Sequence, residues 1–412
     1  MFERYKIIQR FKDYYPNNLE SVNFARVVAV YLYETTTKAI AKRIIFSLFF
    51  TTKNEILGDI ESPWLLVYSV KGKKRADYDD TFHKITKLFP EKYCTLVTTN
   101  KPSPLFFLKL LRHLPAAYRE TDSTLFTRLD RISIVLLIAK LKYEYHNAVN
   151  LKILDRKQGL LTFCDAMPID NLLTQIAKKR HIKTITNQHG QYRVLSNSNM
   201  SQDAEVYANF ISDRIFCWGN ATKHEFLKAG FKHEQLIITG KISSIGTSSK
   251  RESTSANSFG ILFNGENSKH ANFTLLKAAS KLAESTGRTF YIRMHPDNTP
   301  EEYKPEALEH CVGIGFFDDN EYLDLVQFSL GHMTGAIVDL LRNEHRVYLY
   351  DDGRLADVFK VKDLHFTSID EIIEDIKNSN STINRLKARE IYSWFNDDSR
   401  QYEAIFAEIT TK

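Results

Sequence analysis

From residue 64 onward, short apolar runs alternate with amphipathic segments, and this alternation constrains the fold more than any other feature of the sequence. The apolar runs predict strands at residues 64–69, 93–98, 159–164, 183–186, 214–217 and 235–239. Between them, apolar residues recur at helical spacing. Strands that alternate with helices form βαβ units, in which helices cover both faces of a parallel sheet. The sequence therefore predicts a doubly wound α/β lobe.

A second series of the same kind follows a break in composition. Residues 243–258 contain seven serines and two threonines, a composition typical of a linker. Beyond it, strands are expected at residues 259–263, 289–294, 311–314, 328–331 and 346–350, and terminal helices at 369–378 and 383–409. We therefore expect an N-terminal lobe at residues 1–242, a Ser-rich linker at 243–258 and a C-terminal lobe at 259–412.

Residues 1–60 predict helices rather than strands. Apolar residues recur at helical spacing over residues 22–32, and a second helix is expected over residues 37–50. Lys38, Lys42 and Arg43 lie beside the apolar face of this second helix. Such a basic amphipathic helix either packs on its own domain or lies on an anionic membrane surface. Both interpretations stay open.

The charge and the apolar stretches limit the class of protein. The net charge of +6 is spread over 412 residues. This excess is compatible with anionic small molecules or lipid headgroups but too small to indicate nucleic acid as a partner. No uncharged stretch approaches the ~20 residues of a spanning helix, and the N-terminus lacks the apolar core of a secretory signal. We therefore expect a cytoplasmic protein, with peripheral contact to the inner face of the cell membrane as an option.

Cysteine spacing and short motifs exclude several further classes. The four cysteines include no C-x-x-C pair, which argues against a disulfide framework or a zinc site and fits a reducing compartment. No G-x-G-x-x-G, Walker or G-x-S-x-G motif occurs. Basic residues cluster at 71–75, either as a solvated loop or as a contact for an anion. Asp77 and Asp79 start a predicted helix, where acids stabilise the dipole; a metal site is the alternative.

Polar residues that follow predicted strands are the candidates for a functional site, because ligands of open α/β sheets bind beyond the carboxyl ends of the strands. In the N-terminal lobe these residues are Asp165, Gln188, His189, Gly190, Trp218 and Gly219. In the C-terminal lobe they are Asn264, Gly265, Arg293, His295, Pro296, Thr334 and Gly335.

His189 and Asp165 are the candidate catalytic groups. An imidazole that titrates near neutral pH suits a general base toward a sugar hydroxyl, or a contact to phosphate. The structural alternative for His189 is a side chain that caps its own loop. Asp165 either orients this imidazole or is itself the base; alternatively it caps the helix that follows.

His295, Thr334 and Gly335 are candidates for binding phosphate. Pro296 fixes the exit of the strand and thereby holds His295 in place; a structural histidine at an X-Pro boundary is the alternative. Thr334 and Gly335 open a predicted helix, whose first N–H groups suit a phosphate. Thr334 is also a good helix cap without any ligand.

Several of these residues belong to an ordered set of motifs between residues 159 and 350: F-C-D, T-N-Q-H-G-Q-Y, I-F-C-W-G-N, Y-I-R-M-H-P and M-T-G-A-I-V-D. This set resembles bacterial GT-B glycosyltransferases of surface-polysaccharide assembly. The likeness is greatest to the CDP-glycerol glycerophosphotransferase, capsule Kdo-transferase and bacterial polysialyltransferase groups. The resemblance implies a GT-B-like fold: two Rossmann-like, doubly wound parallel-sheet lobes that face each other across a cleft, with an extra N-terminal helical region.

The resemblance also implies roles for single residues. His189 would lie at the reaction centre on the acceptor side, His295 on the donor phosphate, and Thr334 with Gly335 in the nucleotide pocket. Asp339 would lie at the ribose. The sequence departs from the family in two places: it has Met-Thr-Gly instead of a serine pair, and it lacks a D/E-D-G triplet in the first lobe. A CMP-sialic acid donor is therefore not favoured.

The expected activity is transfer of a sugar or polyol phosphate from a nucleotide-activated donor. The acceptor would be a polysaccharide or lipid-linked glycan of capsule, O-antigen lipopolysaccharide or cell-wall polymer synthesis. We expect no cofactor and no metal, because Arg293 and His295 would neutralise the departing phosphate. Two alternatives stay open: a UDP-sugar 2-epimerase-like enzyme, and a non-catalytic protein that binds a nucleotide or a glycan.

Overall fold

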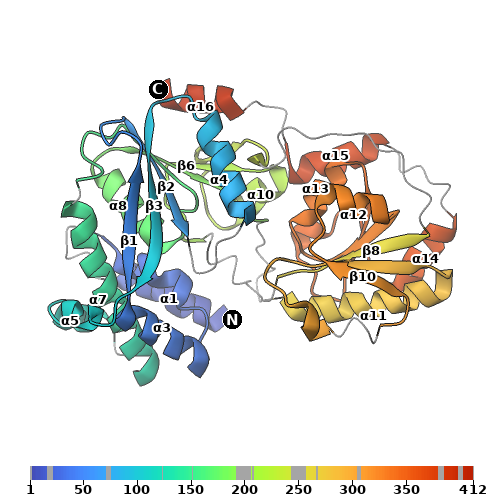
Figure 1. Cartoon of the computed structure of the whole chain (residues 1–412), viewed down its shortest axis with the longest axis horizontal. Coiled ribbons are helices and arrows are strands. Elements are labelled where there is room, and N and C mark those ends of the chain that lie inside the picture. The colour runs from blue at the N-terminus through green and yellow to red at the C-terminus, as the bar shows by residue number, and fades with distance from the viewer. Residues whose placement is uncertain are drawn as a thin grey trace. The chain divides into compact units, whose positions relative to one another are not determined.

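The computed structural model describes residues 2–15, 22–70, 76–122, 124–150, 152–191, 206, 208–242, 257–265, 268–303, 308–378, 385–397 and 402–411. The chain forms two compact units. The first lobe comprises Met1–Trp218, Lys223–Ser243 and Ser399–Lys412. The second lobe comprises Gly219–Thr222 and Ser244–Asp398. Each lobe contains one sheet flanked by helices (Figure 1).

The sheet of the first lobe has seven strands in the order β1-β3-β2-β4-β5-β6-β7. They are β1 (Phe50–Leu57), β2 (Trp64–Val70), β3 (Tyr93–Pro102), β4 (Gly159–Thr162), β5 (Lys183–Asn187), β6 (Arg214–Cys217) and β7 (Leu236–Ile238). From β3 to β7 all neighbours are parallel. This confirms the predicted doubly wound sheet.

Strand β1 corrects the expectation that residues 1–60 are helical. It pairs antiparallel with β3, with Phe50 opposite Pro102 and Leu57 opposite Thr95. From Lys53 onward its side chains alternate between half-buried and exposed. A polar edge strand of this kind has no continuous apolar run, so the sequence pattern does not reveal it.

Helices cover both faces of this sheet. They are α1 (Phe2–Tyr14), α2 (Phe24–Val28), η1 (Ala29–Tyr31), α3 (Thr37–Phe49), α4 (Ala76–Leu88), α5 (Phe106–Leu110), α6 (Leu114–Glu120), α7 (Arg128–Asn150), α8 (Pro168–Lys179) and α16 (Tyr402–Thr411). Helix α10 (Asn220–Lys228) continues from the second lobe into the first, and η2 (His233–Gln235) follows it. None of the helices in the described part of the chain combines the length and apolar character needed to cross a membrane.

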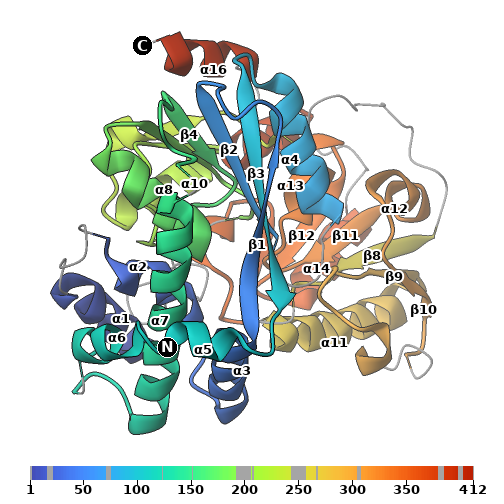
Figure 2. The same ribbon diagram turned by 60° about the vertical axis from the view of Figure 1, so that its left-hand side comes forward.

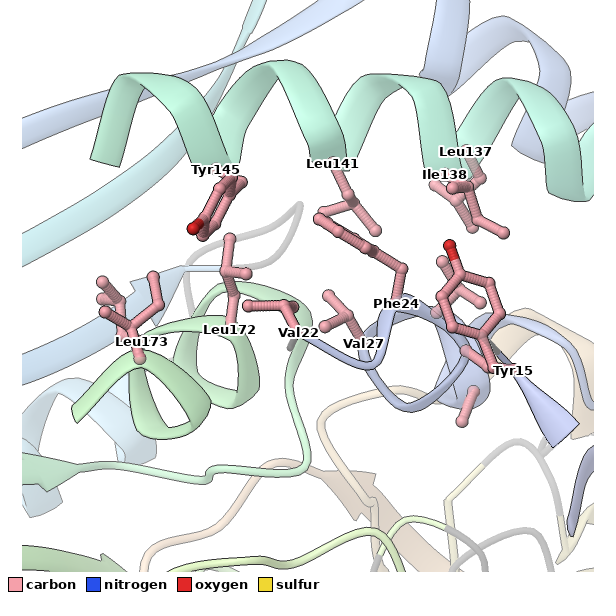
Figure 3. Close-up of a cluster of buried hydrophobic side chains, with 14 of the residues drawn as sticks. Tyr15, Val22, Phe24, Val27, Leu137, Ile138, Leu141, Tyr145, Leu172 and Leu173 are labelled. Carbon is pink, nitrogen blue, oxygen red and sulfur yellow. The ribbon is translucent and has the colours of Figure 1, made fainter. Parts of the chain in front are cut away.

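Two hydrophobic cores lie on opposite faces of the first sheet. On β2, Leu65 and Val67 join the core with α7 and α8, whereas Trp64 and Leu66 join the core with α4 and α16. Figure 3 shows part of the first core, where side chains of α7 point toward Val22, Phe24 and α8. Burial of successive residues on both faces is what the continuous apolar strand pattern predicts.

Helix α3 packs on its own lobe, and Arg43 is not on its exposed basic side. Arg43 is buried; its Nη2 donates to Asp130 Oδ1 at 2.7 Å and its Nη1 to the Tyr31 carbonyl at 2.7 Å. Arg4 of α1 donates to the other oxygen of Asp130 at 2.6 Å. The carboxylate thus joins α1, α3 and α7. Lys38 and Lys42 remain exposed, as expected.

The sheet of the second lobe has six parallel strands in the order β10-β9-β8-β11-β12-β13. They are β8 (Ser258–Leu262), β9 (Thr289–Arg293), β10 (Cys311–Gly315), β11 (Phe328–Gly331), β12 (Arg346–Tyr350) and β13 (His365–Phe366). The helical elements are α11 (Lys269–Thr286), η5 (Pro300–Tyr303), α12 (Asp319–Leu325), α13 (Ala336–Arg342), η7 (Asp357–Phe359), α14 (Ile369–Asn378) and α15 (Arg385–Phe395). The predicted second doubly wound lobe is confirmed.

The C-terminal boundary differs from the expected lobe at residues 259–412. The single helix expected at 383–409 is two helices, α15 and α16, and the segment that holds α16 belongs to the first lobe. Tyr402, Ile405 and Phe406 of α16 are buried in the first-lobe core beside Trp64. The physical reason is the apolar face of α16, which completes that core.

Some expectations fall outside the described residues. These are most of the Ser-rich linker, the basic residues at 71–75 and the side chain of Asp77. Asp79 is described: its Oδ1 accepts a hydrogen bond from the Tyr68 hydroxyl at 2.8 Å. The four cysteines are free thiols, as expected.

Candidate active-site residues

The turn that follows β5, residues 187–191, carries His189 and is held by a set of hydrogen bonds; we call it the His189 turn. Gln188 N donates to Phe216 O at 2.9 Å, and Gln188 Oε1 accepts from Trp218 N at 2.6 Å. Gln188 Nε2 donates to Gly190 O at 2.8 Å, and Trp218 Nε1 donates to Gln188 O at 3.1 Å. Gln188 and Trp218, two of the predicted candidates for the functional site, are buried and fix the shape of this turn.

Helix α16 adds a contact to the same turn from the far end of the chain. The Tyr402 hydroxyl donates to Asn187 Oδ1 at 2.8 Å, and both residues are buried. Asn187 is the last residue of β5 and precedes Gln188 and His189. Tyr402 lies 215 residues from Asn187 in the sequence. No local pattern could have identified it.

Aromatic rings orient the His189 side chain. The ring of Tyr78 lies edge-on to the imidazole, with centroids 5.6 Å apart. The ring of Phe163 lies 5.7 Å from it in a tilted arrangement. His189 itself is half-buried. The imidazole is therefore oriented and still partly accessible, as a general base must be.

Gln191, at the end of the His189 turn, belongs to the T-N-Q-H-G-Q-Y motif but is not among the predicted site residues. Its side chain is buried, and neither Nε2 nor Oε1 has a hydrogen-bond partner among the described residues. A buried amide normally bonds at both atoms, because burial without a partner costs free energy. An amide in this condition is suited to a ligand hydroxyl, which donates one hydrogen bond and accepts another.

Asp165 lies where the sequence placed it, after β4, but its carboxylate bonds to protein groups. Oδ2 accepts from Ile211 N at 3.0 Å, from Ser212 N at 2.7 Å and from Ser212 Oγ at 2.6 Å. The residue is completely buried, and this burial raises the pKa of its carboxyl to about 6. These contacts make Asp165 a link between the loops that precede α8 and β6.

Replacing Asp165 with asparagine tests this role. Between pH 4 and pH 6 the native carboxyl holds a proton that the unfolded chain, with an ordinary pKa of 3.8, has lost. The Asp165 carboxyl therefore contributes about 2–3 kcal/mol to the unfolding free energy below pH 4. This contribution is lost as the pH rises through 6. Asparagine keeps an acceptor oxygen and does not ionise. From pH 4 to pH 7 the wild type should therefore lose about 2–3 kcal/mol of unfolding free energy that the Asp165→Asn variant does not lose. Urea unfolding of both proteins at the two pH values measures this difference.

A constant difference across this pH range would show that the carboxyl does not hold the proton. Activity of the same variant separates the two roles of Asp165. Retained turnover assigns the residue to loop positioning, whereas loss of turnover in a stable variant supports the predicted base.

In the second lobe, Asn264 joins three strand ends. Its N–H donates to Asn272 Oδ1 at 2.7 Å, and its carbonyl accepts from Asn298 Nδ2 at 2.7 Å. Its Oδ1 accepts from Met333 N at 2.8 Å. Asn264 is buried and therefore acts on a ligand only through the loops that it holds. These bonds bring residues 333–335 beside the end of β8.

Gly265 and His295 are in contact. A Cβ atom added to Gly265 would lie 3.2 Å from His295 Cε1, tighter than ordinary van der Waals contact. His295 Nδ1 accepts from Asp297 N at 3.2 Å, and the side chain is 24% exposed. Pro296 is exposed in this turn. The sequence thus correctly predicted that His295 is fixed at the strand end, and Gly265 leaves the room for it.

Arg293 carries a buried donor that bonds to no residue in the described part of the chain. Its Nη2 donates to Asp319 Oδ1 at 2.6 Å, and its guanidinium lies 5.4 Å above the ring of Tyr322. Nη1 is buried and bonds to none of the described residues. A buried guanidinium nitrogen left in this way is suited to an anionic ligand, since charge-assisted hydrogen bonds to phosphate are strong.

The remaining candidates of the second lobe surround the start of α13. Thr334 is buried, and its Oγ1 accepts from Ala336 N at 3.5 Å. Apart from its own chain neighbours and helix backbone, no described residue lies within 4 Å of the position that a Cβ at Gly335 would occupy. Asp339 is half-buried in α13. Gly219 has another role, since a Cβ there would lie 2.6 Å from the backbone of Phe395.

The sequence matches no protein-family model and no curated protein. Among solved structures, the fold is similar to that of the UDP-GlcNAc 2-epimerase from Methanocaldococcus jannaschii in complex with UDP-GlcNAc and UDP. The identity is 11%, the match covers 85% of this chain and 99% of that chain, and the TM-score is 0.52. This similarity confirms a GT-B-like architecture of two α/β lobes.

Two further solved structures match this chain with TM-scores below 0.5. The wall teichoic acid polymerase TagF is 10% identical over 99% of this chain and 96% of that chain, with a TM-score of 0.45. A variant of S. aureus TarM, in complex with fondaparinux, alpha-GlcNAc-glycerol and UDP, is 12% identical over 65% of this chain, with a TM-score of 0.44. The chain spans 57% of the length of that TarM chain.

Proposed function

We propose that the protein is a glycosyltransferase that moves a sugar, or a polyol phosphate, from a nucleotide-activated donor to a hydroxyl of a glycan. The observation that carries this proposal is Arg293, whose buried Nη1 has no partner among the described residues. It ends β9, at the edge of the sheet where α/β proteins bind ligands. A phosphate of the donor would satisfy this nitrogen.

The donor would bind in the second lobe. Arg293 and His295 contact its phosphates, and Thr334 and Gly335 line the nucleotide pocket. Asp339 bonds to the ribose, while Asn264, Gly265 and Pro296 shape the loops. The M. jannaschii epimerase of similar fold holds UDP-GlcNAc and UDP, which supports a nucleotide sugar as the donor.

The acceptor would bind at the His189 turn of the first lobe. His189 takes the proton of the acceptor hydroxyl as the oxygen bonds to the transferred group. In the same step the bond from that group to the leaving phosphate breaks, and the electron pair stays on the phosphate. Arg293 and His295 stabilise this charge, so that the proposal requires no metal. Gln191 is suited to a second hydroxyl of the acceptor.

We further propose that the acceptor is a polysaccharide or a lipid-linked glycan of capsule, O-antigen or cell-wall polymer synthesis. The support for this part is the sequence resemblance, together with exposed Lys38 and Lys42 on α3. A lipid-linked acceptor would require the enzyme to work at the inner face of the cell membrane.

Thermal unfolding in the presence of CMP, CDP, UDP and GDP tests the donor site. A nucleotide at 100 times its Kd adds about 2.7 kcal/mol to the stability of the native state. We expect one of the four to raise Tm by roughly 5 °C. His295→Ala should reduce this shift, because the variant loses a phosphate contact. His310→Asn is the control, since His310 lies in the same lobe and is not a candidate residue. No shift with any of the four nucleotides would contradict the proposal.

A UDP-sugar 2-epimerase is the second candidate, favoured by the fold similarity to the M. jannaschii enzyme. It would convert UDP-GlcNAc without any acceptor. A transferase would consume the donor only when an acceptor hydroxyl is present, and a non-catalytic binder would leave the donor unchanged. Incubation of UDP-GlcNAc with and without a bacterial glycan fraction therefore separates the three functions.

A further inference from the structure

Helix α5 and the chain around it reverse the normal pattern of a surface helix. Phe106 and Leu110 are buried, as one face of a surface helix should be. Besides the exposed Lys109 and Arg112, four outward positions, which are normally polar, are instead apolar. They are occupied by Leu105, Phe107, Leu108 and Leu111, whose exposed fractions lie between 38% and 68%.

Two exposed apolar residues of α3 lie at the neighbouring helix. Ile45 is 52% exposed and Phe49 is 41% exposed. Ser103 N donates to Phe49 O at 2.7 Å, which joins the end of α3 to the chain that leads into α5. Both views show the two helices side by side (Figures 1 and 2). We call this surface the α3–α5 face; its apolar residues are Ile45, Phe49, Leu105, Phe107, Leu108 and Leu111.

The charged residues of the two segments that form the α3–α5 face, residues 35–54 and 95–119, are all basic. Its exposed basic residues are Lys38, Lys42, Lys101, Lys109 and Arg112. Neither residues 35–54 nor residues 95–119 contain an aspartate or a glutamate. Leucine and phenylalanine flanked by lysine and arginine, without acids, are typical of segments that lie in the headgroup region of an anionic bilayer.

The strand order places this face at the edge of the sheet that carries the His189 turn. Helix α5 follows the carboxyl end of β3, and the His189 turn follows the carboxyl end of β5. Strands β3, β2, β4 and β5 are parallel neighbours, so these two ends lie at the same edge. Helix α3 also ends there, because Phe50 of β1 lies opposite Pro102 of β3.

We propose that the α3–α5 face docks the protein on an anionic membrane surface. Insertion of the exposed leucine and phenylalanine side chains removes apolar area from water, and each lysine or arginine near an anionic leaflet adds about 1 kcal/mol. A second copy of the chain fits this face less well, because a two-fold interface would set the basic residues against one another. The part of this inference that concerns access to a lipid-linked acceptor rests on the proposed function.

Co-sedimentation with vesicles tests the proposal in the absence of donor and acceptor. The full chain is mixed with phosphatidylcholine vesicles, with or without phosphatidylglycerol. We expect it to sediment with the anionic vesicles and to be released by salt. Leu105→Ser combined with Leu108→Ser should weaken this partitioning at least about tenfold, through lost apolar burial. Lys38→Glu combined with Lys42→Glu should weaken it on anionic vesicles only.

The matched control replaces Val312 and Phe316 with serine, since these second-lobe residues are similarly exposed, at 51% and 57%. This control should sediment like the wild type. Failure of the wild type to bind anionic vesicles would overturn the proposal. It would also be overturned if the control variant bound these vesicles as weakly as the Leu105/Leu108 variant. A concentration-dependent dimer that the Leu105/Leu108 variant abolishes would assign the face to a second copy instead. The nucleotide experiment above is independent of each of these results.

Discussion

Replacing His189 with asparagine is expected to lower kcat of the proposed transfer reaction by about 10²–10⁴-fold, the range typical for loss of a general base. Asparagine occupies similar space beside Tyr78 and Phe163 but cannot take a proton from the acceptor hydroxyl. Nucleotide binding should be unchanged, because the proposed donor residues belong to the other lobe. The measurement is nucleotide release from the donor identified by the thermal screen, with bacterial glycan fractions as acceptor.

The pH profile gives a second measure of the same role. In the wild type, turnover should fall at acid pH as the imidazole becomes protonated, and the asparagine variant should lose this dependence. His181→Asn is a suitable control, since His181 is exposed with a backbone φ of 57°, which asparagine tolerates. A His189→Asn enzyme with full activity would remove His189 from the mechanism and favour a binding role.

Replacing Phe406 with alanine is expected to destabilise the first lobe by about 3–5 kcal/mol, the cost of emptying a buried phenylalanine site. Phe406 is completely buried. Its ring centroid lies 4.9 Å from that of Phe89, 5.5 Å from Phe216 and 5.1 Å from Tyr402. The measurement is urea unfolding followed by a probe in the first lobe.

The same variant should also slow the reaction. Loss of Phe406 loosens α16, and α16 supplies the Tyr402 hydroxyl that bonds to Asn187 beside His189. Phe316→Ala is the control, because an exposed phenylalanine of the second lobe should change stability by no more than about 0.5 kcal/mol. An unchanged unfolding midpoint for Phe406→Ala would contradict the packing of α16 on this lobe.

Local patterns in the sequence were sufficient to predict most of both sheets. Residues 64–68 are apolar or aromatic without interruption, and β2 is indeed buried on both faces. Strand β1 was missed because Lys53, Asn54 and Glu55 are polar and only one side of an edge strand is covered. The placement of α16 was missed for a different reason: its partners lie far away in the sequence, and periodicity reports only neighbours along the chain.

The candidate site was predictable in position but not in hydrogen bonding. Strand ends correctly grouped Gln188 with His189, and Gly265 with His295. The sequence could not show that Gln188 and Asn264 bond to other protein groups, whereas the buried Nη1 of Arg293 and the amide of Gln191 lack partners among the described residues. Such differences depend on which atoms meet in three dimensions.

The first lobe contains segments that precede and follow the second lobe in the sequence, and this order matters during biosynthesis. A ribosome must translate residues 244–398, the whole second segment of the other lobe, before α16 exists. At about 5–20 residues per second this takes roughly 8–30 s. Throughout that interval the nascent first lobe lacks Phe406 in its aromatic core and the Tyr402 hydroxyl at Asn187. The His189 turn therefore acquires its full support only after residues 244–398 of the second lobe have been synthesised.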